Sequence, residues 1–153
     1  MIDREHPREL AAHPISTSLP VQWGDQDAFG HVNNVVYFRW MESARIEYFH
    51  RAGLGATTAN QAAGPILASI KCDFRRQLAY PDMVLVSASI ASIGRTSMKM
   101  VHLVYSMSQQ AIAAEGESVI VMFDYQAQRP ILVAEDIRAK IDAVERQAGQ
   151  SKH

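Results

Sequence analysis

The spacing of apolar residues divides the chain into one long helix and a series of strands. After Asn34, apolar side chains recur every three or four residues, which is the period of one helix face. The residues of this stripe are Val36, Tyr37, Trp40, Met41, Ala44 and Tyr48. The charged residues expected on the other faces are Arg39, Glu42, Arg45 and Glu47. Gly53 suits the position after a helix C-terminus, so the pattern predicts a helix of about 18 residues that ends near Ala52.

Shorter runs rich in β-branched and aromatic residues lie on both sides of this helix. One run ends at Gly24, and four more follow the helix with no helical pattern between them. The predicted strands cover residues 16–23, 66–74, 83–93, 97–108 and 111–125. Because consecutive strands with short connections usually pair, we expect the last four to form antiparallel meanders. Apolar residues at helical spacing then predict a short C-terminal helix over residues 135–147.

The order of these elements predicts an α+β fold, with a five-stranded antiparallel sheet covering one long helix. Residues 1–15 are polar and mixed in charge, so we expect a flexible N-terminal arm before a single domain over residues 16–147. One face and one edge of such a sheet stay exposed unless a second subunit covers them. The pattern therefore favours a homodimer or homotetramer.

Composition and charge narrow the function. The chain has 153 residues and a formal net charge of −1, so no broad attraction to nucleic acid or to an anionic membrane is expected. No apolar run is long enough to predict a transmembrane helix. Cys72 is the only cysteine, which excludes an intrachain disulfide and a cysteine-based zinc site and agrees with a cytoplasmic location. The histidines show no metal-binding spacing, so we expect neither a metal nor a cofactor.

The loop before the long helix is the best candidate for chemistry. It places Asp27 just before Gly30-His31 and an asparagine pair, of which Asn33 or Asn34 is the expected N-cap. A helix N-terminus leaves free N–H groups that stabilise an oxyanion, and a neighbouring carboxylate can act as a nucleophile or base. Asp25 is the competing carboxylate, for which we favour a role in the turn or in packing.

Four stretches of the chain, in this order, resemble hot-dog-fold acyl-CoA thioesterases of the 4-hydroxybenzoyl-CoA thioesterase type. The most specific stretch is WGDQDAFGHVNNVVYFRWMESAR, and it is supported by CDFRRQLAYPDMVLV, SIGRTSM and AAEGESVIVMFDYQAQRP. The resemblance covers roughly residues 17–140. It implies a sheet wrapped around a long central helix, with active sites between paired subunits.

The resemblance also implies roles for individual residues. Asp27 matches the catalytic carboxylate, and the backbone N–H that polarises the thioester carbonyl falls at about Asn34. His31 is a candidate for binding the substrate or orienting a neighbour. The turn that meets the nucleotide end of coenzyme A falls on Arg95, Thr96 and Ser97. This turn is less basic than in the benzoyl-type enzymes, so we expect either fewer phosphate contacts or contacts shared with Arg75, Arg76 or Lys99.

The sequence thus predicts an enzyme that hydrolyses acyl-CoA thioesters to the free acid and coenzyme A, the latter being part of the substrate. Direct attack by Asp27 and activation of a water by Asp27 both remain open. Acyl carrier protein thioesters are further candidate substrates. One alternative is a hot-dog hydratase or dehydratase, although the Asn-Pro step of those enzymes is missing near Asp27 and His31. Another is a non-catalytic hot-dog domain that binds acyl-CoA.

Overall fold

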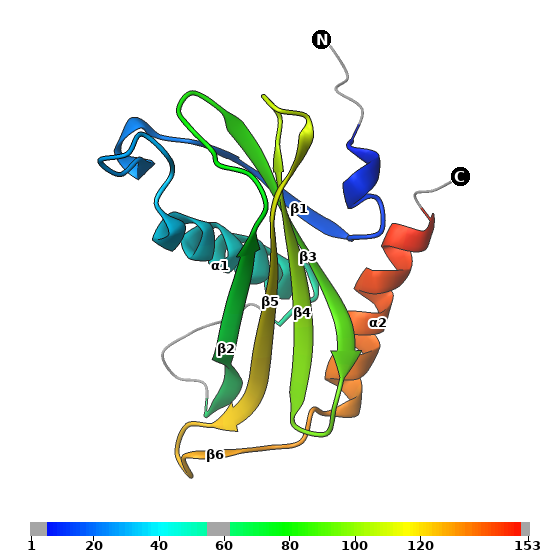
Figure 1. Cartoon of the computed structure of the whole chain (residues 1–153). Coiled ribbons are helices and arrows are strands. Elements are labelled where there is room, and N and C mark those ends of the chain that lie inside the picture. Colours follow the sequence, from blue (N-terminus) through cyan, green and yellow to red (C-terminus); the bar gives the residue numbers. More distant parts are fainter. Residues whose placement is uncertain (1–5, 55–61, 151–153) are drawn as a thin grey trace.

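A curled antiparallel sheet wraps around one long helix in the computed structural model, which describes residues 6–54 and 62–150 (Figure 1). The strands are β1 (Ile15–Pro20), β2 (Ala63–Phe74), β3 (Met83–Ile93), β4 (Ser97–Ser106), β5 (Ala111–Asp124) and the short β6 (Arg129–Pro130). The α-helices are α1 (Asn34–Arg51) and α2 (Glu135–Gln150), and the 3-10 turns are η1 (Arg8–Leu10) and η2 (Trp23–Asp25). The predicted fold class is confirmed.

The order of strands in the sheet is β1-β3-β4-β5-β2, with β6 added beside β5. The antiparallel meander predicted for β3, β4 and β5 is confirmed. The expected pairing of β2 with β3 is wrong, because β2 pairs with β5, and Phe74 lies opposite Ala114. The connection over residues 75–82 crosses instead to the other side of the sheet. As a result β1 and β2, which flank α1 in the sequence, lie at opposite ends of the sheet that curls around that helix, and β2 is an edge strand.

The local signals that bound α1 are confirmed. Oδ1 of Asn33 accepts a hydrogen bond from the Val35 N–H at 3.1 Å, and Gly53 adopts the left-handed conformation with φ of 75°. All six residues of the predicted apolar stripe are buried. The helix also lies very close to β5, since a Cβ added to Gly116 would lie 2.5 Å from the sulfur of Met41. A glycine at this position lets the helix pack directly on the sheet.

Two residues expected outside the core are buried. Arg45 is only 7% exposed, although it was predicted on a charged face of the helix. It follows Tyr37 and Met41 at spacings of four, so helix geometry carries it to the inner side of α1. Leu10, in the predicted N-terminal arm, is fully buried in η1. Residues 1–5 of that arm lie outside the described residues.

The C-terminal helix covers part of β3. β1 pairs with β3 only as far as Ala88, and α2 lies beside the strand beyond that point (Figure 1). Both carboxylate oxygens of Glu145 bind there: Oε1 accepts from the Tyr48 hydroxyl at 2.7 Å and from the Ile90 N–H at 2.6 Å, and Oε2 accepts from the Ser89 hydroxyl at 2.9 Å. Glu145 thus joins α2, α1 and β3.

Candidate active site

The loop before α1 folds into a tight turn closed by backbone hydrogen bonds. Gln26 and Val32 pair as an antiparallel bridge. Inside it, the Asp27 N–H donates to the His31 carbonyl at 2.9 Å, and the Gly30 N–H donates to the Asp27 carbonyl at 3.1 Å. Gly30 has φ of 80°, which glycine adopts without strain. The turn therefore holds the backbone of Asp27 at a fixed place just before the helix.

The carboxylate of Asp27 is exposed and only partly occupied by this turn. Its Oδ1 accepts a hydrogen bond from the Phe29 N–H at 2.9 Å. Within residues 6–54 and 62–150, its Oδ2 has no hydrogen-bond partner. One oxygen thus orients the side chain and leaves the other available to a substrate or a water.

The first turn of α1 leaves one backbone donor free at the predicted position. The Val35 N–H is satisfied by the side chain of Asn33, and the Val36 N–H donates to the Asn33 carbonyl at 3.0 Å. The N–H of Asn34 has no hydrogen bond to any residue that the structure describes. An unpaired amide at a helix N-terminus is a suitable donor to a developing oxyanion.

Asp27, His31 and Asn34 line one cleft of about 450 Å³, so the structure brings the three predicted catalytic residues together. Tyr37 from α1 and Phe74 from the end of β2 form an apolar wall, with their rings packed edge to face at a centroid distance of 4.9 Å. The sequence pattern assigned Tyr37 to the core alone, and it gave no signal that Phe74 would reach this cleft. The fold places them there because β2 ends beside the start of α1.

Arg75 and Arg76 also line this cleft. Both backbone N–H groups donate to the Ala113 carbonyl, at 2.8 and 3.0 Å, which fixes their position after β2. The guanidinium of Arg75 donates to Glu115 at 3.1 Å. That of Arg76 has no hydrogen bond or ion pair with another described residue. Arg76 is therefore a free cation at the edge of the cleft.

The turn that contains Arg95, Thr96 and Ser97 lies far from this cleft in the same chain. It joins β3 to β4, and Ser97 lies opposite Val121, which in turn lies opposite Ile66 near the start of β2. The cleft is at the other end of β2, beside Phe74. Eight residues of strand span about 26 Å at roughly 3.3 Å per residue. One protomer alone therefore does not bring the predicted coenzyme A turn to Asp27.

Asp25 has a structural role. Its side chain is 5% exposed, with Oδ1 accepting from Arg39 Nη2 at 2.9 Å and Oδ2 accepting from the Gln22 N–H at 2.8 Å. Its carbonyl accepts from the Asn33 N–H at 2.9 Å. All of these contacts hold the loop against α1, in agreement with the role in the turn that we favoured.

Half-buried Cys72 and buried His102 are not suited to nucleophilic or acid–base chemistry at neutral pH. Burial, with a smaller effect of Asp73, raises the pKa of the Cys72 thiol to about 11, so the thiolate is scarce. His102 is 1% exposed, and burial lowers its pKa to about 4. Its Nδ1 lies 3.0 Å from the Ser87 carbonyl and its Nε2 lies 2.8 Å from the Ser118 hydroxyl. His102 is thus a neutral packing residue of β4.

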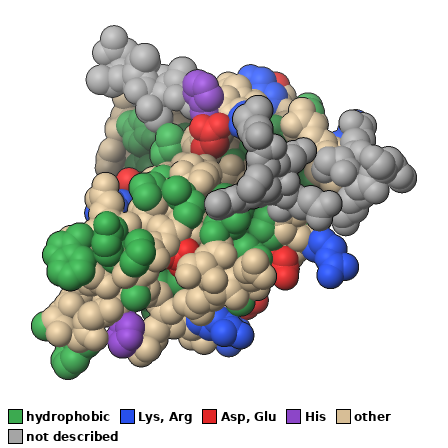
Figure 2. Space-filling view, turned by 90° about the horizontal axis from the view of Figure 1, so that it is seen from above, with side chains coloured by type: hydrophobic (Ala, Val, Ile, Leu, Met, Phe, Trp, Pro, Cys, Tyr) green, Lys and Arg blue, Asp and Glu red, His purple; other side chains and the backbone are tan. Residues whose placement is uncertain are grey.

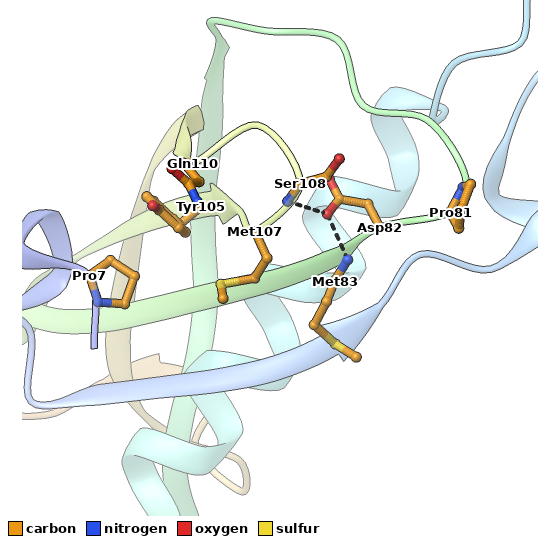
Figure 3. Close-up of a pocket in the computed structure, with 8 residues that line it drawn as sticks. All are labelled: Pro7, Pro81, Asp82, Met83, Tyr105, Met107, Ser108 and Gln110. Atoms are coloured by element: carbon orange, nitrogen blue, oxygen red, sulfur yellow. Dashed lines mark hydrogen bonds between the residues drawn. The ribbon is translucent and has the colours of Figure 1, made fainter. Parts of the chain in front are cut away.

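A larger cavity, about 750 Å³, lies between Pro7 and the turn from β4 to β5 (Figure 3). Its one carboxylate belongs to Asp82, whose Oδ1 accepts from the Met83 N–H at 2.7 Å and the Ser108 N–H at 2.9 Å. The other oxygen of Asp82 accepts from the Ser106 hydroxyl. This carboxylate is occupied in holding the turn, so the described residues that line the cavity offer no free carboxylate.

Two further features bear on the predicted chemistry. Across residues 6–54 and 62–150, no three histidine, cysteine, aspartate or glutamate side chains are grouped so as to hold a metal ion. No helix in the same residues has the length and apolar character needed to cross a membrane. Figure 2 shows hydrophobic side chains gathered on one side of the surface. Trp23 and Phe29, in and just before the Asp27 loop, and Tyr80, whose ring packs on Trp23, are all exposed.

Comparison with known proteins identifies the family. The model of the Thioesterase-like superfamily matches residues 21–141, so the chain belongs to this superfamily. A thioesterase from Thermus thermophilus, solved with coenzyme A and Zn, is 33% identical, with a TM-score of 0.75 over 88% of this chain and 96% of that chain. The PA2801 protein, a putative thioesterase from Pseudomonas aeruginosa, is 29% identical, with a TM-score of 0.76 over 84% of this chain and 98% of that chain. These likenesses confirm the hot-dog fold.

A curated relative with an assigned activity is also similar. The chloroplastic acyl-acyl carrier protein thioesterase ATL3 of Arabidopsis thaliana is 25% identical over 123 residues, which are 80% of this chain. The matches span 56% and 64% of the lengths of the curated relatives. Family membership and these thioesterase neighbours together support the predicted thioester hydrolase. The narrower assignment to the 4-hydroxybenzoyl-CoA thioesterase type stays a prediction.

Proposed function

We propose that this protein hydrolyses acyl-CoA thioesters to a free acid and coenzyme A. The observation that carries the proposal is that Asp27 and Asn34 line one cleft, while the Asp27 Oδ2 and the Asn34 N–H have no hydrogen-bond partner among the described residues. The Thermus thermophilus structure with bound coenzyme A supports the choice of thiol carrier. Acyl carrier protein thioesters are the second candidate, because the Arabidopsis relative is named for that substrate.

The cleft supports a simple division of roles. The thioester carbonyl oxygen accepts a hydrogen bond from the Asn34 N–H, which stabilises the negative charge of the tetrahedral intermediate. Asp27 then acts in one of two ways. It attacks the carbonyl carbon and expels the coenzyme A thiolate, leaving a mixed anhydride that water hydrolyses. Alternatively, it removes a proton from the water that attacks the carbon. His31, in the same cleft, contacts the acyl group or the attacking water.

A second subunit fits the exposed seam between α1 and β2. β2 is an edge strand whose outer side is unpaired in the sheet. Beside it lie four exposed apolar side chains: Val35 at 66%, Ile46 at 54%, Leu67 at 43% and Phe74 at 48%. Natural proteins rarely leave an apolar edge strand uncovered. We propose that two β2 strands pair antiparallel about a two-fold axis and bury this seam.

This pairing would bring an Arg95 turn close to the cleft, although the two lie far apart within one chain. An antiparallel contact reverses the direction of the second β2 strand, so the Arg95 turn of one subunit approaches the cleft of the other. Coenzyme A then lies across the interface, with Arg76 of one chain and Arg95 of the other as its cationic contacts. Arginine is well suited to phosphate because its planar group donates two parallel hydrogen bonds.

The proposal is tested by thiol release from short, medium, long and aromatic acyl-CoAs. We expect wild-type turnover on at least one class, and a fall of about 100-fold or more in kcat for Asp27→Asn, which loses the nucleophile or base. Asp142→Asn, which removes an exposed carboxylate of α2, serves as the matched control and keeps wild-type turnover.

Three outcomes would contradict the proposal. Turnover by Asp27→Asn within a few-fold of wild type removes Asp27 from the mechanism. Hydration of an enoyl-CoA without release of thiol assigns the protein to the hydratases. Tight binding of acyl-CoA without turnover in any class assigns it to non-catalytic binding domains.

A further inference from the structure

Arg45 carries a buried positive charge that the described residues compensate only in part, through one long ion pair with an exposed carboxylate. Its side chain is 9% exposed, and its Nη1 is shielded from solvent without a hydrogen-bond partner. The nearest carboxylate belongs to Glu42, whose Oε2 lies 3.8 Å from Nη2 and whose side chain is 66% exposed. Burial lowers the pKa of Arg45 more than Glu42 raises it. A buried guanidinium is costly unless an anion and good hydrogen bonds satisfy it.

Other buried polar groups do not supply this anion. His102 on β4 is close enough for the charge of Arg45 to contribute to its lowered pKa, after the larger effect of burial. At about 4, that pKa leaves His102 neutral at pH 7. Its two ring nitrogens are already engaged by Ser87 and Ser118. Among the described residues, Glu42 at 3.8 Å is thus the one ion-pair partner of Arg45, and Nη1 is left without an acceptor.

Arg45 lines a cavity of about 170 Å³ between the second half of α1 and the first half of β2. The remaining walls are aliphatic and aromatic, with Phe49 from α1, Ile66 from β2 and Ile120 from β5 among them. Among the residues that the structure describes, Arg45 is the single charged one in this lining. At roughly 30 Å³ per water, the space corresponds to about six waters, which is enough for a carboxylate and a few methylene groups. The cavity thus has apolar walls and one cationic group, the guanidinium of Arg45.

The cavity and the Asp27 cleft lie along the same seam of α1 and β2. The cleft is at Asn34 and Phe74, and the cavity is at Arg45 and Ile66. Along the helix, eleven residues from Asn34 to Arg45 correspond to about 17 Å. In the proposed antiparallel dimer the seam of the second subunit runs the opposite way. The cavity of one subunit therefore comes next to the cleft of the other, in reach of an acyl chain whose thioester lies at Asp27.

We infer that Arg45 selects acyl thioesters whose acyl chain ends in a carboxylate, namely the mono-thioesters of short dicarboxylic acids. The inference rests on the proposed hydrolysis and on pairing through β2. The terminal carboxylate binds the guanidinium with two oxygens, and the apolar walls contact the methylene groups. An unsubstituted alkyl chain of the same length leaves Arg45 without its anion, so it binds less well.

The test compares substrates of equal carbon number: glutaryl-CoA against pentanoyl-CoA, and adipyl-CoA against hexanoyl-CoA. For the wild type we expect kcat/KM at least 10-fold higher for the carboxylated member of each pair. Arg45→Gln and Arg45→Met should abolish or reverse this preference, measured as the ratio of kcat/KM within each pair. Arg51→Met is the matched control, since Arg51 is an exposed residue of the same helix paired with Glu47, and it should keep the preference.

The outcomes separate this inference from the proposed function. If no thioester is hydrolysed, the proposed function fails and the inference fails with it. If both members of each pair are hydrolysed equally by the wild type, or if both Arg45 variants lose the two substrates in parallel, the inference alone fails. Dissociation of the dimer by both variants in sedimentation would also overturn it, because the partner of Arg45 would then be a group of the second subunit. Thermal melting checks that each variant is folded.

Discussion

The carboxylates of Asp25 and Asp27 are two residues apart in one loop but have opposite environments. Asp25 is 5% exposed and binds Arg39 at 2.9 Å and the Gln22 N–H at 2.8 Å. Asp27 is exposed and uses only Oδ1, in a hydrogen bond with the Phe29 N–H. Asp25 thus stabilises the loop, whereas Oδ2 of Asp27 is available to a substrate or a water.

This contrast predicts a split between stability and activity. Asp25→Asn should lower the free energy of unfolding by about 1–3 kcal/mol, because an amide cannot accept from both donors that Asp25 now satisfies. Asp27→Asn should leave stability within about 0.5 kcal/mol, since asparagine also accepts the hydrogen bond that closes this turn. Chemical denaturation of both variants measures the difference. Equal losses would contradict the assignment.

The proposed pairing through β2 predicts which substitutions prevent dimer formation. Lysine in place of Ile46 or Leu67 would put like charges on both sides of a two-fold contact and should shift the protein from dimer to monomer in sedimentation velocity. Turnover should fall in parallel because the cleft then lacks its second subunit. Met83→Lys is the control, as Met83 is 38% exposed and lies on β3 opposite Pro20, at the other end of the sheet from β2. A wild-type monomer with full activity would refute the proposed interface.

The close approach of α1 to β5 gives a packing prediction. Gly116→Ala should cost about 1–3 kcal/mol of stability, because the new Cβ would lie 2.5 Å from Met41, which is fully buried. In the background of Met41→Ala the same substitution should cost little, so a double-mutant cycle in denaturant should show strong coupling. Gly24→Ala, where a Cβ meets no atom within 4 Å, is the control. Additive effects would show that the two sites are not coupled and would contradict this packing contact.

Glu145 predicts how strongly α2 is attached. Glu145→Leu leaves the Ile90 N–H and two hydroxyls without an acceptor, so it should cost about 1–3 kcal/mol. Tyr48→Phe removes only one donor and should cost about 0.5–1.5 kcal/mol, and less once Glu145 is already replaced. Thermal melting measures both. Hydrolysis by folded enzyme should be unchanged, since neither residue lines the Asp27 cleft.

His102 predicts the acid stability of the fold. Its pKa falls from 6.5 in the unfolded chain to about 4 in the native state, chiefly through burial. Between these values the unfolded state binds a proton that the native state does not, so stability is full above pH 6.5 and is lost as pH falls toward 4. The slope is about 1.4 kcal/mol per pH unit. His102→Asn should remove this part of the slope in denaturation measured from pH 7 to 4, and an unchanged slope would contradict the assignment.

The parts of the structure that were predicted correctly depend on short-range physics. The bounds of α1 follow from the apolar period, the N-cap side chain of Asn33 and the glycine at position 53. The cleft formed by Asp27, His31 and Asn34 was predictable for the same reason, because all three lie within one turn and the helix start that follows it.

The parts that were missed depend on contacts distant in sequence. The residue pattern of β2 does not indicate that this strand pairs with β5. The positions of Phe74, Arg75 and Arg76 in the cleft could therefore not be predicted from the sequence. The burial of Arg45 was not predicted, because we placed it on an outer face on account of its charge, although its spacing in the helix puts it on the inner face.

By itself, the sequence determined the helix, most of the strands and the identity of the acidic loop, since backbone hydrogen bonding and side-chain periodicity act over a few residues. Only the tertiary structure decided which strand forms the free edge, which arginine is buried and which one stands at the cleft. Those outcomes depend on how the sheet curls around α1, because strand register and crossing connections bring together groups that no local pattern relates.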